Sequence, residues 1–267
     1  MTAMTQSAPQ ADPPFILSEV RDGVGIITLN RPEKRNPLST AMITAIHDQV
    51  AAWEHDKSVR VMVIKALGPV FSAGHDLQEV LSMDQEQAAG LMDHCTTMME
   101  KIRLTPKPII AQVHALATAA GCQLAASCDL VVASETASFQ TPGVLIGLFC
   151  STPMVPLSKV IPPKKAVEML FTGKPMPASE AALHGLVNRV VPPAQLDEAT
   201  LGLAAEIKAH SLYTLGLGKE AFYKQLPMGM QDSYAVGKEA MLKNLPAHDA
   251  QEGISAFLQK RKPEWRD

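Results

Sequence analysis

Hydrophobic and polar positions alternate in two short blocks near the start of the chain and then settle into longer periodic stretches. Residues 15–20 and 24–29 predict two strands, and Asp22-Gly23 between them is typical of a hairpin turn. Residues 39–56 predict a helix, because apolar side chains recur every three or four positions after Ser39, which can cap its start. That apolar stripe comprises Met42, Ile43, Ile46, Val50 and Trp53.

Strand and helix patterns then alternate along the chain. Strands are predicted over residues 59–66, 108–116 and 129–133, and helices over 85–104 and 119–128. After Pro192 the strand pattern ends, and helical patterns follow over 194–210, 212–225, 230–244 and 249–260. This order predicts an α/β core over residues 15–205 and a helical C-terminal region over 206–267.

The first fourteen residues contain no Lys, no Arg and no apolar block. They match neither a secretory signal, which needs an apolar segment, nor a transit peptide, which is rich in Arg. We therefore expect residues 1–14 to form a disordered tail and the protein to be cytoplasmic.

Composition and charge exclude several classes of protein. The 267 residues are 46% hydrophobic and carry a net charge of −3, which suits a globular core and lacks the basic balance of a nucleic-acid-binding protein. No apolar run reaches the roughly 18 residues that a membrane span requires. The four cysteines form no C-x-x-C pair, so we expect buried, reduced thiols and no metal site.

A first segment with candidate chemistry runs from Phe71 to Leu77. Gly74 permits a tight turn, and Asp76 and Glu79 have the spacing of a capping box, so a helix is expected to begin at Leu77. The backbone N–H of His75 would then lie just outside that helix, free to face a pocket. An ordinary strand–loop–helix junction is the alternative interpretation.

A second segment, residues 114–124, leads from a strand into a helix through a run of small residues. Such residues let a ligand approach the backbone, and a helix N-terminus offers unpaired N–H groups with a partial positive charge. One N–H from each segment, converging on one oxygen, would form an oxyanion hole. The alternative is that Ala and Gly here only permit tight packing of helix on sheet.

A third segment reads Thr141-Pro142-Gly143-Val144 and continues through residues 146–153 as a glycine-punctuated loop ahead of a helix. The three segments occur in order with Asn30-Arg31-Pro32, residues 122–129, 171–174 and 178–191, and a tail over 251–262. Together they resemble the enoyl-CoA hydratase/isomerase (crotonase) family. The similarity covers roughly residues 15–265, and residues 117–124, 141–143 and 147–153 favour one branch of that family.

The resemblance implies a fold and an assembly. The fold is α/β, with a crotonase-like spiral core of ββα units and a helical C-terminal trimerisation region. The expected assembly is a trimer or a dimer of trimers. The implied partner is an acyl-CoA thioester, with coenzyme A as part of the substrate and no separate cofactor or metal, and the implied setting is fatty-acid or acyl-CoA metabolism.

The resemblance also implies site residues. The oxyanion donors would be the N–H groups of His75 and Ala120. Contacts with the pantetheine and thioester are expected from His75, Asp76, Leu77, Gln78, Gly121, Cys150 and Ser151. Phe257 and Lys260 would lie near the CoA adenine and phosphate of a neighbouring subunit.

The chain departs from the family pattern at the two positions where a hydratase carries its glutamates. These positions hold Gln123 and Gly143, neither of which can transfer a proton near neutral pH. Efficient hydration is therefore not expected, although the lyase class stays the first hypothesis. The alternatives are a malonyl-type acyl-CoA decarboxylase, which needs the oxyanion hole but no carboxylate base, and a non-catalytic acyl-CoA-binding protein.

Overall fold

A computed structural model describes residues 13–266, and the expected tail over residues 1–14 falls almost entirely outside them. The main sheet has six strands in the order β1-β2-β3-β4-β6-β9. Their bounds are β1 Ile16–Arg21, β2 Val24–Leu29, β3 Val61–Ala66, β4 Ile109–Val113, β6 Leu130–Ser134 and β9 Arg189–Val191. Only β1 and β2 are antiparallel, and their turn places Asp22 at φ 48° and Gly23 at φ 79°, as a tight hairpin requires.

A smaller sheet lies beside the first and consists of β5 (Leu116–Thr118), β7 (Ser138–Gln140) and β8 (Met176–Pro177). The predicted single strand over residues 108–116 is therefore wrong. The chain leaves the main sheet after Val113, and β5 begins in the second sheet at Leu116. Both strands are largely buried, so apolar residues continue through the bend and the hydrophobic pattern does not show where one strand ends and the next begins.

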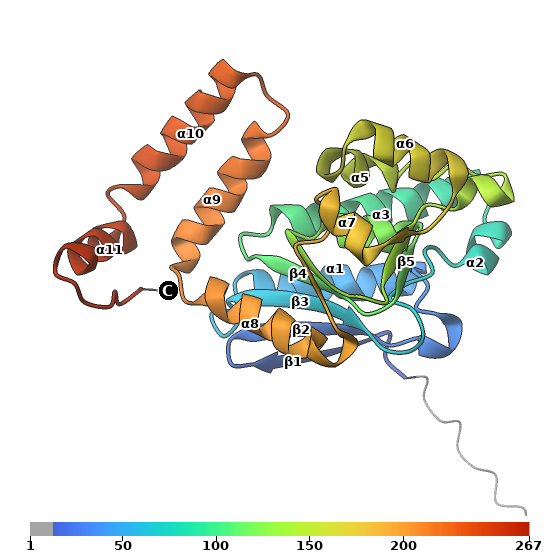
Figure 1. Cartoon of the computed structure of the whole chain (residues 1–267), viewed down its shortest axis with the longest axis horizontal. Helices are drawn as coiled ribbons and strands as arrows, with labels where there is room; N and C mark the ends of the chain where they lie inside the picture. The colour runs from blue at the N-terminus through green and yellow to red at the C-terminus, as the bar shows by residue number, and fades with distance from the viewer. Residues whose placement is uncertain (1–12, 267) are drawn as a thin grey trace, which may run out of the picture.

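Helices cover both faces of the main sheet (Figure 1). On one face pack α1 (Thr40–Glu54), α3 (Gln85–Leu104) and α4 (Ala120–Ser127), and on the other packs α8 (Leu196–Lys208). The predicted stripe of α1 is wholly buried, and Ser39 caps the helix by accepting a hydrogen bond from the Met42 N–H. Two covered faces explain why β2 is buried at every position.

The remaining helices complete the described chain. They are α2 (Leu77–Ser82), α5 (Met154–Val160), α6 (Pro163–Thr172), α7 (Ala178–Leu183), α9 (Leu212–Gln225), α10 (Met230–Asn244) and α11 (His248–Leu258). Short 3₁₀ turns lie at η1 (Pro32–Lys34), η2 (Gly143–Ile146) and η3 (Pro193–Gln195). The observed bounds of α3, α9 and α10 coincide with the predicted ranges. Within residues 13–266, no helix is both long and apolar enough to cross a membrane.

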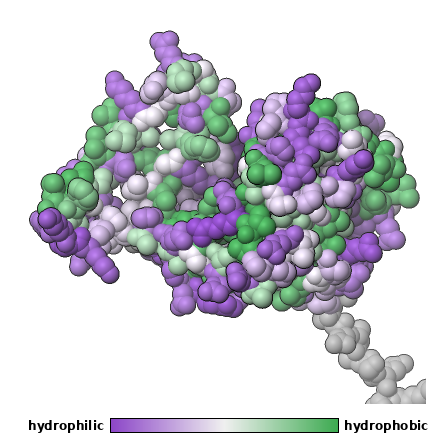
Figure 2. Space-filling model, viewed as in Figure 1, coloured by the Kyte–Doolittle hydropathy of each residue, from purple (hydrophilic) through white to green (hydrophobic). Residues whose placement is uncertain are grey.

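The last three helices, α9 to α11, stand away from the sheets (Figure 1), and hydrophobic residues lie on their surface (Figure 2). Exposed large apolar side chains here include Phe222, Met230, Tyr234, Met241, Leu242, Ile254, Phe257 and Leu258. Apolar surface of this extent is typical of an interface.

A buried ion pair ties α9 to the core. The Asp129 carboxylate, just ahead of β6, accepts hydrogen bonds from Lys219 Nζ at 2.6 Å, Tyr223 Oη at 2.9 Å and the Ile109 N–H at 2.7 Å. The Lys219 side chain is only 7% exposed, and its Nζ also donates to two backbone oxygens at 3.0 Å. Burial lowers the pKa of Lys219, and the Asp129 carboxylate opposes that shift.

We predict that Lys219→Met destabilises the protein by about 3–5 kcal/mol, because it leaves the buried Asp129 charge without its partner. Urea unfolding measures the change. Lys238→Met on the exposed surface of α10 is the matched control and should change stability little. Equal unfolding midpoints for the two variants would contradict this role of the ion pair.

Candidate functional site

The loop between β3 and α2 packs against the first residues of α4. Gly74 has φ 87°, and a Cβ there would lie 2.8 Å from the Ala119 Cβ and 3.2 Å from the Ala120 nitrogen. A Cβ on Gly121 would lie 2.6 Å from the Ser72 oxygen. Glycine is thus needed on both sides of this contact, because any side chain would push the two segments apart.

The start of α4 has an unusual backbone. Ala119, the residue before the helix, adopts φ 50° and ψ −120°, a strained conformation for a residue with a Cβ. The first helical hydrogen bond runs from the Gln123 N–H to the Ala119 oxygen at 3.0 Å, so the N–H of Ala120 precedes the helical ladder. Among the hydrogen bonds of the described residues, neither the Ala120 N–H nor the His75 N–H has an acceptor.

The two acids beside His75 already have partners. The Asp76 carboxylate caps α2 by accepting from the N–H groups of Gln78 and Glu79 at 3.0 and 3.3 Å, which confirms the predicted helix start at Leu77. Glu79 does not complete the predicted capping box. Its carboxylate instead accepts from the Thr40 N–H at 3.1 Å, because the start of α1 lies within reach and offers an unpaired donor.

The imidazole of His75 is held by its backbone surroundings. Nδ1 lies 3.1 Å from the Leu38 oxygen, and since a carbonyl only accepts, Nδ1 must carry the proton. Burial lowers the pKa of His75, so the ring is neutral near pH 7, and its buried Nε2 has no partner among residues 13–266. His75 lines a cavity of about 430 Å³ together with Lys34, Pro37, Ala73, Asp76, Leu77 and Gln78.

A second cavity, of about 510 Å³, lies between α3, α4, α5 and α9. We call it the inter-helix cavity. Gln123 lines it and is only 4% exposed, and its Oε1 has no hydrogen-bond partner in the described part of the chain. Apolar walls come from Met99, Ala126, Val155, Pro156, Val160, Phe222 and Leu226.

Gly143 has no space for a side chain. A Cβ there would lie 2.9 Å from the Leu148 oxygen and 3.1 Å from Cys150 Sγ. The Gly143 N–H donates to the same sulfur at 3.3 Å, so the thiol lies where a side chain at position 143 would begin. Burial raises the pKa of Cys150, and it raises that of Cys122 to about 12, so neither thiol is ionised near neutrality.

Comparison with known proteins shows which family the chain belongs to. The family model described as enoyl-CoA hydratase/isomerase matches residues 19–267. The chain belongs to the enoyl-CoA hydratase/isomerase family. It is 46% identical over 257 residues to mouse "Enoyl-CoA hydratase domain-containing protein 3, mitochondrial", covering 96% of this chain and 86% of the relative. The human protein of that name is 49% identical over 245 residues, or 91% and 81% of the two chains.

Solved structures of the enoyl-CoA hydratase/isomerase family share the fold. An enoyl-CoA hydratase from Mycobacterium smegmatis superimposes with a TM-score of 0.92 at 43% identity, over 95% of this chain and 99% of the other. The structure of human enoyl Coenzyme A hydratase domain-containing protein 3 superimposes with a TM-score of 0.91 at 48% identity, over 94% of this chain and 100% of the other. The expected fold class, family and branch are confirmed.

The expected cytoplasmic location is contradicted. Relatives that are 45–49% identical over most of the chain carry the word mitochondrial in their names. The first fourteen residues lack Lys, Arg and an apolar block. That absence does not determine a compartment.

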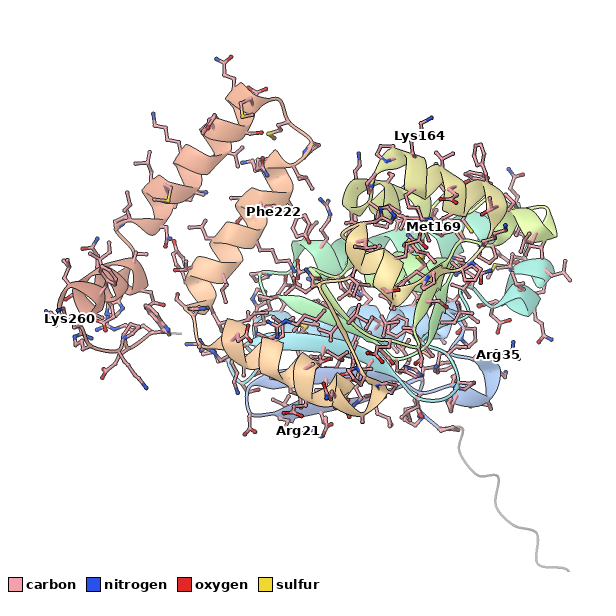
Figure 3. The ribbon with its side chains drawn as sticks, viewed as in Figure 1. Arg21, Arg35, Lys164, Met169, Phe222 and Lys260 are labelled. Atoms are coloured by element: carbon pink, nitrogen blue, oxygen red, sulfur yellow. The ribbon has the colours of Figure 1, made fainter. Side chains whose placement is uncertain are left out.

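Within one chain, the structure does not bring all the expected site residues together. Phe257 is 82% exposed on α11, and Lys260 follows that helix at the opposite end of the molecule from α2 (Figures 1 and 3). A role for either at a neighbouring subunit's site stays a prediction. Ser151 is exposed and its hydroxyl donates to the Phe149 oxygen, while Gly121 packs against Ser72.

Sequence reasoning missed several polar groups near the site. The buried hydroxyls of Thr118 and Thr141 also lack partners among the described residues, and these residues flank the ends of β5 and β7 next to α4. Arg103 and Tyr223 line the inter-helix cavity from α3 and α9. No local pattern marks Arg103 and Tyr223, because they share a cavity with Gln123 only after distant helices have packed.

Proposed function

We propose that this chain binds an acyl-CoA thioester and polarises its carbonyl through the N–H groups of His75 and Ala120. The observation that carries the proposal is the contact of Gly74 with Ala119 and Ala120, since it places the His75 loop beside the first N–H of α4. Both N–H groups lack an acceptor among the described residues. A thioester oxygen would accept from both, as a carbonyl does in an oxyanion hole.

The charge that develops on that oxygen would be stabilised in two ways. Backbone donors are already oriented, so they need not reorganise during the reaction. The N-terminus of α4 adds the positive end of a helix dipole. The pantetheine would pass the cavity lined by Lys34, Asp76, Leu77 and Gln78, where Lys34 supplies a positive charge.

Membership of the enoyl-CoA hydratase/isomerase family supports an acyl-CoA substrate. Which reaction the chain catalyses depends on the acids and bases at the site. Proton transfer to or from carbon requires a positioned acid or base. Gln123 and Gly143 provide none, and Asp76 and Glu79 are engaged at helix starts. The neutral His75 ring keeps a lone pair at Nε2 and is the remaining candidate for a weak base.

Decarboxylation of a malonyl-type thioester is the second candidate, and the missing carboxylates favour it. The bond between Cα and the carboxylate carbon breaks, CO₂ leaves, and the electron pair forms an enolate whose oxygen lies in the oxyanion hole. Water then supplies the proton to Cα. A glutamate at position 123 or 143 would repel the substrate carboxylate, whereas Gln and Gly do not. Acyl-CoA binding without turnover would instead identify a non-catalytic binding protein.

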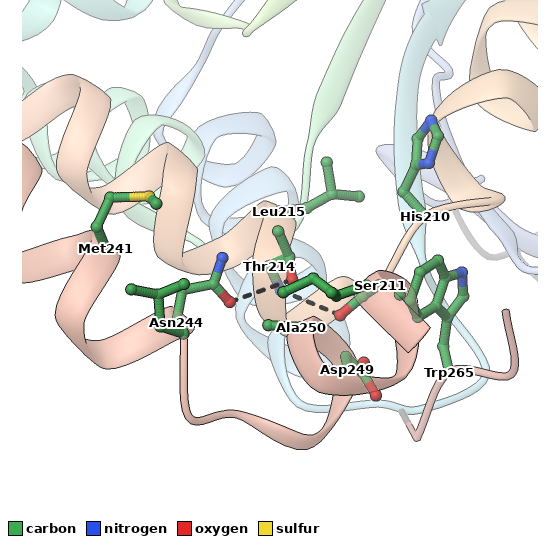
Figure 4. A pocket seen from close by; sticks show the side chains of 12 residues that line it. His210, Ser211, Thr214, Leu215, Met241, Asn244, Asp249, Ala250 and Trp265 are labelled. Carbon is green, nitrogen blue, oxygen red and sulfur yellow. Dashed lines mark hydrogen bonds between the residues drawn. The ribbon is translucent and has the colours of Figure 1, made fainter. Parts of the chain in front are cut away.

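We also propose self-association as a trimer or a dimer of trimers through the C-terminal helices. A cavity of about 460 Å³ lies among α9, α10 and α11 (Figure 4). In this cavity the Thr214 hydroxyl donates a hydrogen bond to Asn244 Oδ1 at 3.4 Å. Asp249 is buried, and its Oδ2 has no hydrogen-bond partner in the described part of the chain. This cavity and the exposed apolar residues around it support an interface.

Light scattering at micromolar concentration should return a mass that is a multiple of three chains. The apolar side chains on α9 to α11 would then be covered by neighbouring copies. A monomer at that concentration would contradict the assembly.

The binding site is tested with Ala120→Val. We predict that butyryl-CoA binding weakens at least about tenfold, because added methyl groups beside the N–H donor overpack the position of the thioester oxygen. Calorimetry measures affinity, and thermal unfolding checks the fold. His75→Ala should retain binding, because its N–H remains, and Ala89→Val on the exposed face of α3 is the control. Unchanged affinity of Ala120→Val would place the thioester elsewhere.

The reaction is tested with crotonyl-CoA. We predict that the unmodified protein hydrates it at least about 100-fold more slowly than a typical turnover of about 10 per second, because each missing acid or base supplies about 10²- to 10⁴-fold. Gln123→Glu should raise the rate. Gly143→Glu should not, because position 143 has no space for a side chain. A parent rate near 10 per second would show that another residue transfers the protons.

A further inference from the structure

The chain reverses direction after α11. Lys260 adopts φ 56°, a left-handed conformation typical of the end of a helix, and the Arg261 N–H donates back to the Ala256 oxygen at 3.0 Å. The residues that follow run back from α11 toward the start of α9 (Figure 1). Residues 259–266 thus connect α11 with the corner where α8 ends and α9 begins, and we call them the C-terminal strap.

Polar bonds hold the C-terminal strap along α11. The Arg261 guanidinium donates to both carboxylate oxygens of Glu252, at 2.6 and 2.8 Å, and the Glu264 N–H donates to the same carboxylate at 2.8 Å. The Arg266 N–H donates to the Asp249 carboxylate at 2.8 Å. Two parallel bonds between a guanidinium and a carboxylate fix orientation as well as distance. The strap therefore has a defined position on α11.

Trp265 joins the C-terminal strap to the corner between α8 and α9. Its ring packs on Gly253 of α11, where a Cβ would lie only 3.2 Å from the indole. Its Nε1–H donates to the Ala209 oxygen at 2.7 Å, and the side chain lines one cavity with His210 and Ser211 (Figure 4). One side chain therefore contacts both α11 and this corner.

The corner itself is anchored to the core. Arg60, which directly precedes β3, donates from Nε to the Lys208 oxygen and from Nη2 to the His210 oxygen, both at 2.9 Å. Only two residues of α11 are buried, so packing alone holds this helix weakly. The bond of Trp265 to the same corner therefore helps to fix the position of α11 against the main sheet.

The position of α11 matters because of what its end exposes. Phe257 is 82% exposed, and Lys260 is exposed at the reversal of the chain. An aromatic ring and a positive charge match a nucleotide, whose base stacks on such rings and whose phosphates pair with such charges. Both residues lie at the opposite end of the molecule from α2, so a nucleotide that they contact belongs to a ligand on another copy (Figures 1 and 3).

We propose that Trp265 is a positioning residue that holds α11 where Phe257 and Lys260 contact the nucleotide end of an acyl-CoA bound to a neighbouring copy. The inference rests on the proposed function and on the proposed assembly, because it needs both an acyl-CoA and a second copy. It gives the C-terminal strap a role in ligand binding in addition to its contacts within the fold.

The test compares butyryl-CoA with S-butyryl pantetheine, which lacks the nucleotide and its phosphates, by calorimetry on the full chain. We expect the parent to bind butyryl-CoA about 100-fold more tightly, and Trp265→Ala to lower that ratio about tenfold, because α11 is no longer fixed. Binding of S-butyryl pantetheine should not change. An equal loss for both ligands, or an unchanged ratio, would overturn the inference. Failure of both ligands to bind the parent would overturn the proposed function itself.

A double-mutant cycle separates positioning from damage to the fold or the assembly. In a chain that already carries Phe257→Ala and Lys260→Gln, adding Trp265→Ala should weaken butyryl-CoA binding less than about twofold, because the positioned groups are absent. A full tenfold loss in that background would assign Trp265 to the fold or the assembly alone and overturn the inference. Light scattering checks the mass of each variant. Glu264→Gln is the control and should bind as the parent does, since its backbone N–H remains.

Discussion

The candidate site depends on one close contact, in which the backbone at Ser72 and Gly74 lies directly against the first residues of α4. Neither Gly74 nor Gly121 has room for a Cβ, and Ala119 accepts a strained conformation at the junction. Strand β5 of the smaller sheet holds the loop at this contact, since the Thr118 N–H donates to the Ser72 oxygen at 3.0 Å. Strain at this point is stored by the surrounding fold, as is common where ligands bind.

A second constraint, the buried pair of Asp129 and Lys219, joins the site to the C-terminal helices. Asp129 lies at the start of β6, close behind α4, while Lys219 and Tyr223 come from α9. Because a buried charge without its partner is costly, α9 cannot leave the core freely. The helix that carries exposed apolar surface therefore also walls the inter-helix cavity, so the region proposed for assembly and the wall beside Gln123 share one helix.

The two positions that depart from the family pattern differ physically. Gln123 keeps a full-length side chain in the place of a glutamate, and it remains buried and lacks a partner for Oε1 among the described residues. Gly143 instead lies against Cys150 and the Leu148 oxygen, so the space beside it is already filled. The first position has a hydrogen-bonding side chain without acid–base chemistry, whereas the second has no side chain and no space for one.

The sequence by itself determined the elements whose signals are local. The Asp22-Gly23 turn, the Ser39 cap, the stripe of α1 and the range of α9 follow from turn chemistry and periodicity. The candidate donors His75 and Ala120 came from the resemblance, and the fold places their segments in contact. Only the tertiary structure decided the bend between β4 and β5, the bond of Glu79 to α1, the filled space at Gly143 and the cavity at Gln123. The bond of Glu79 and the cavity at Gln123 depend on residues far apart in the chain, and a one-dimensional pattern does not show which distant groups meet. The bend and the space at Gly143 depend on the path of the backbone, which the hydrophobic pattern does not show either.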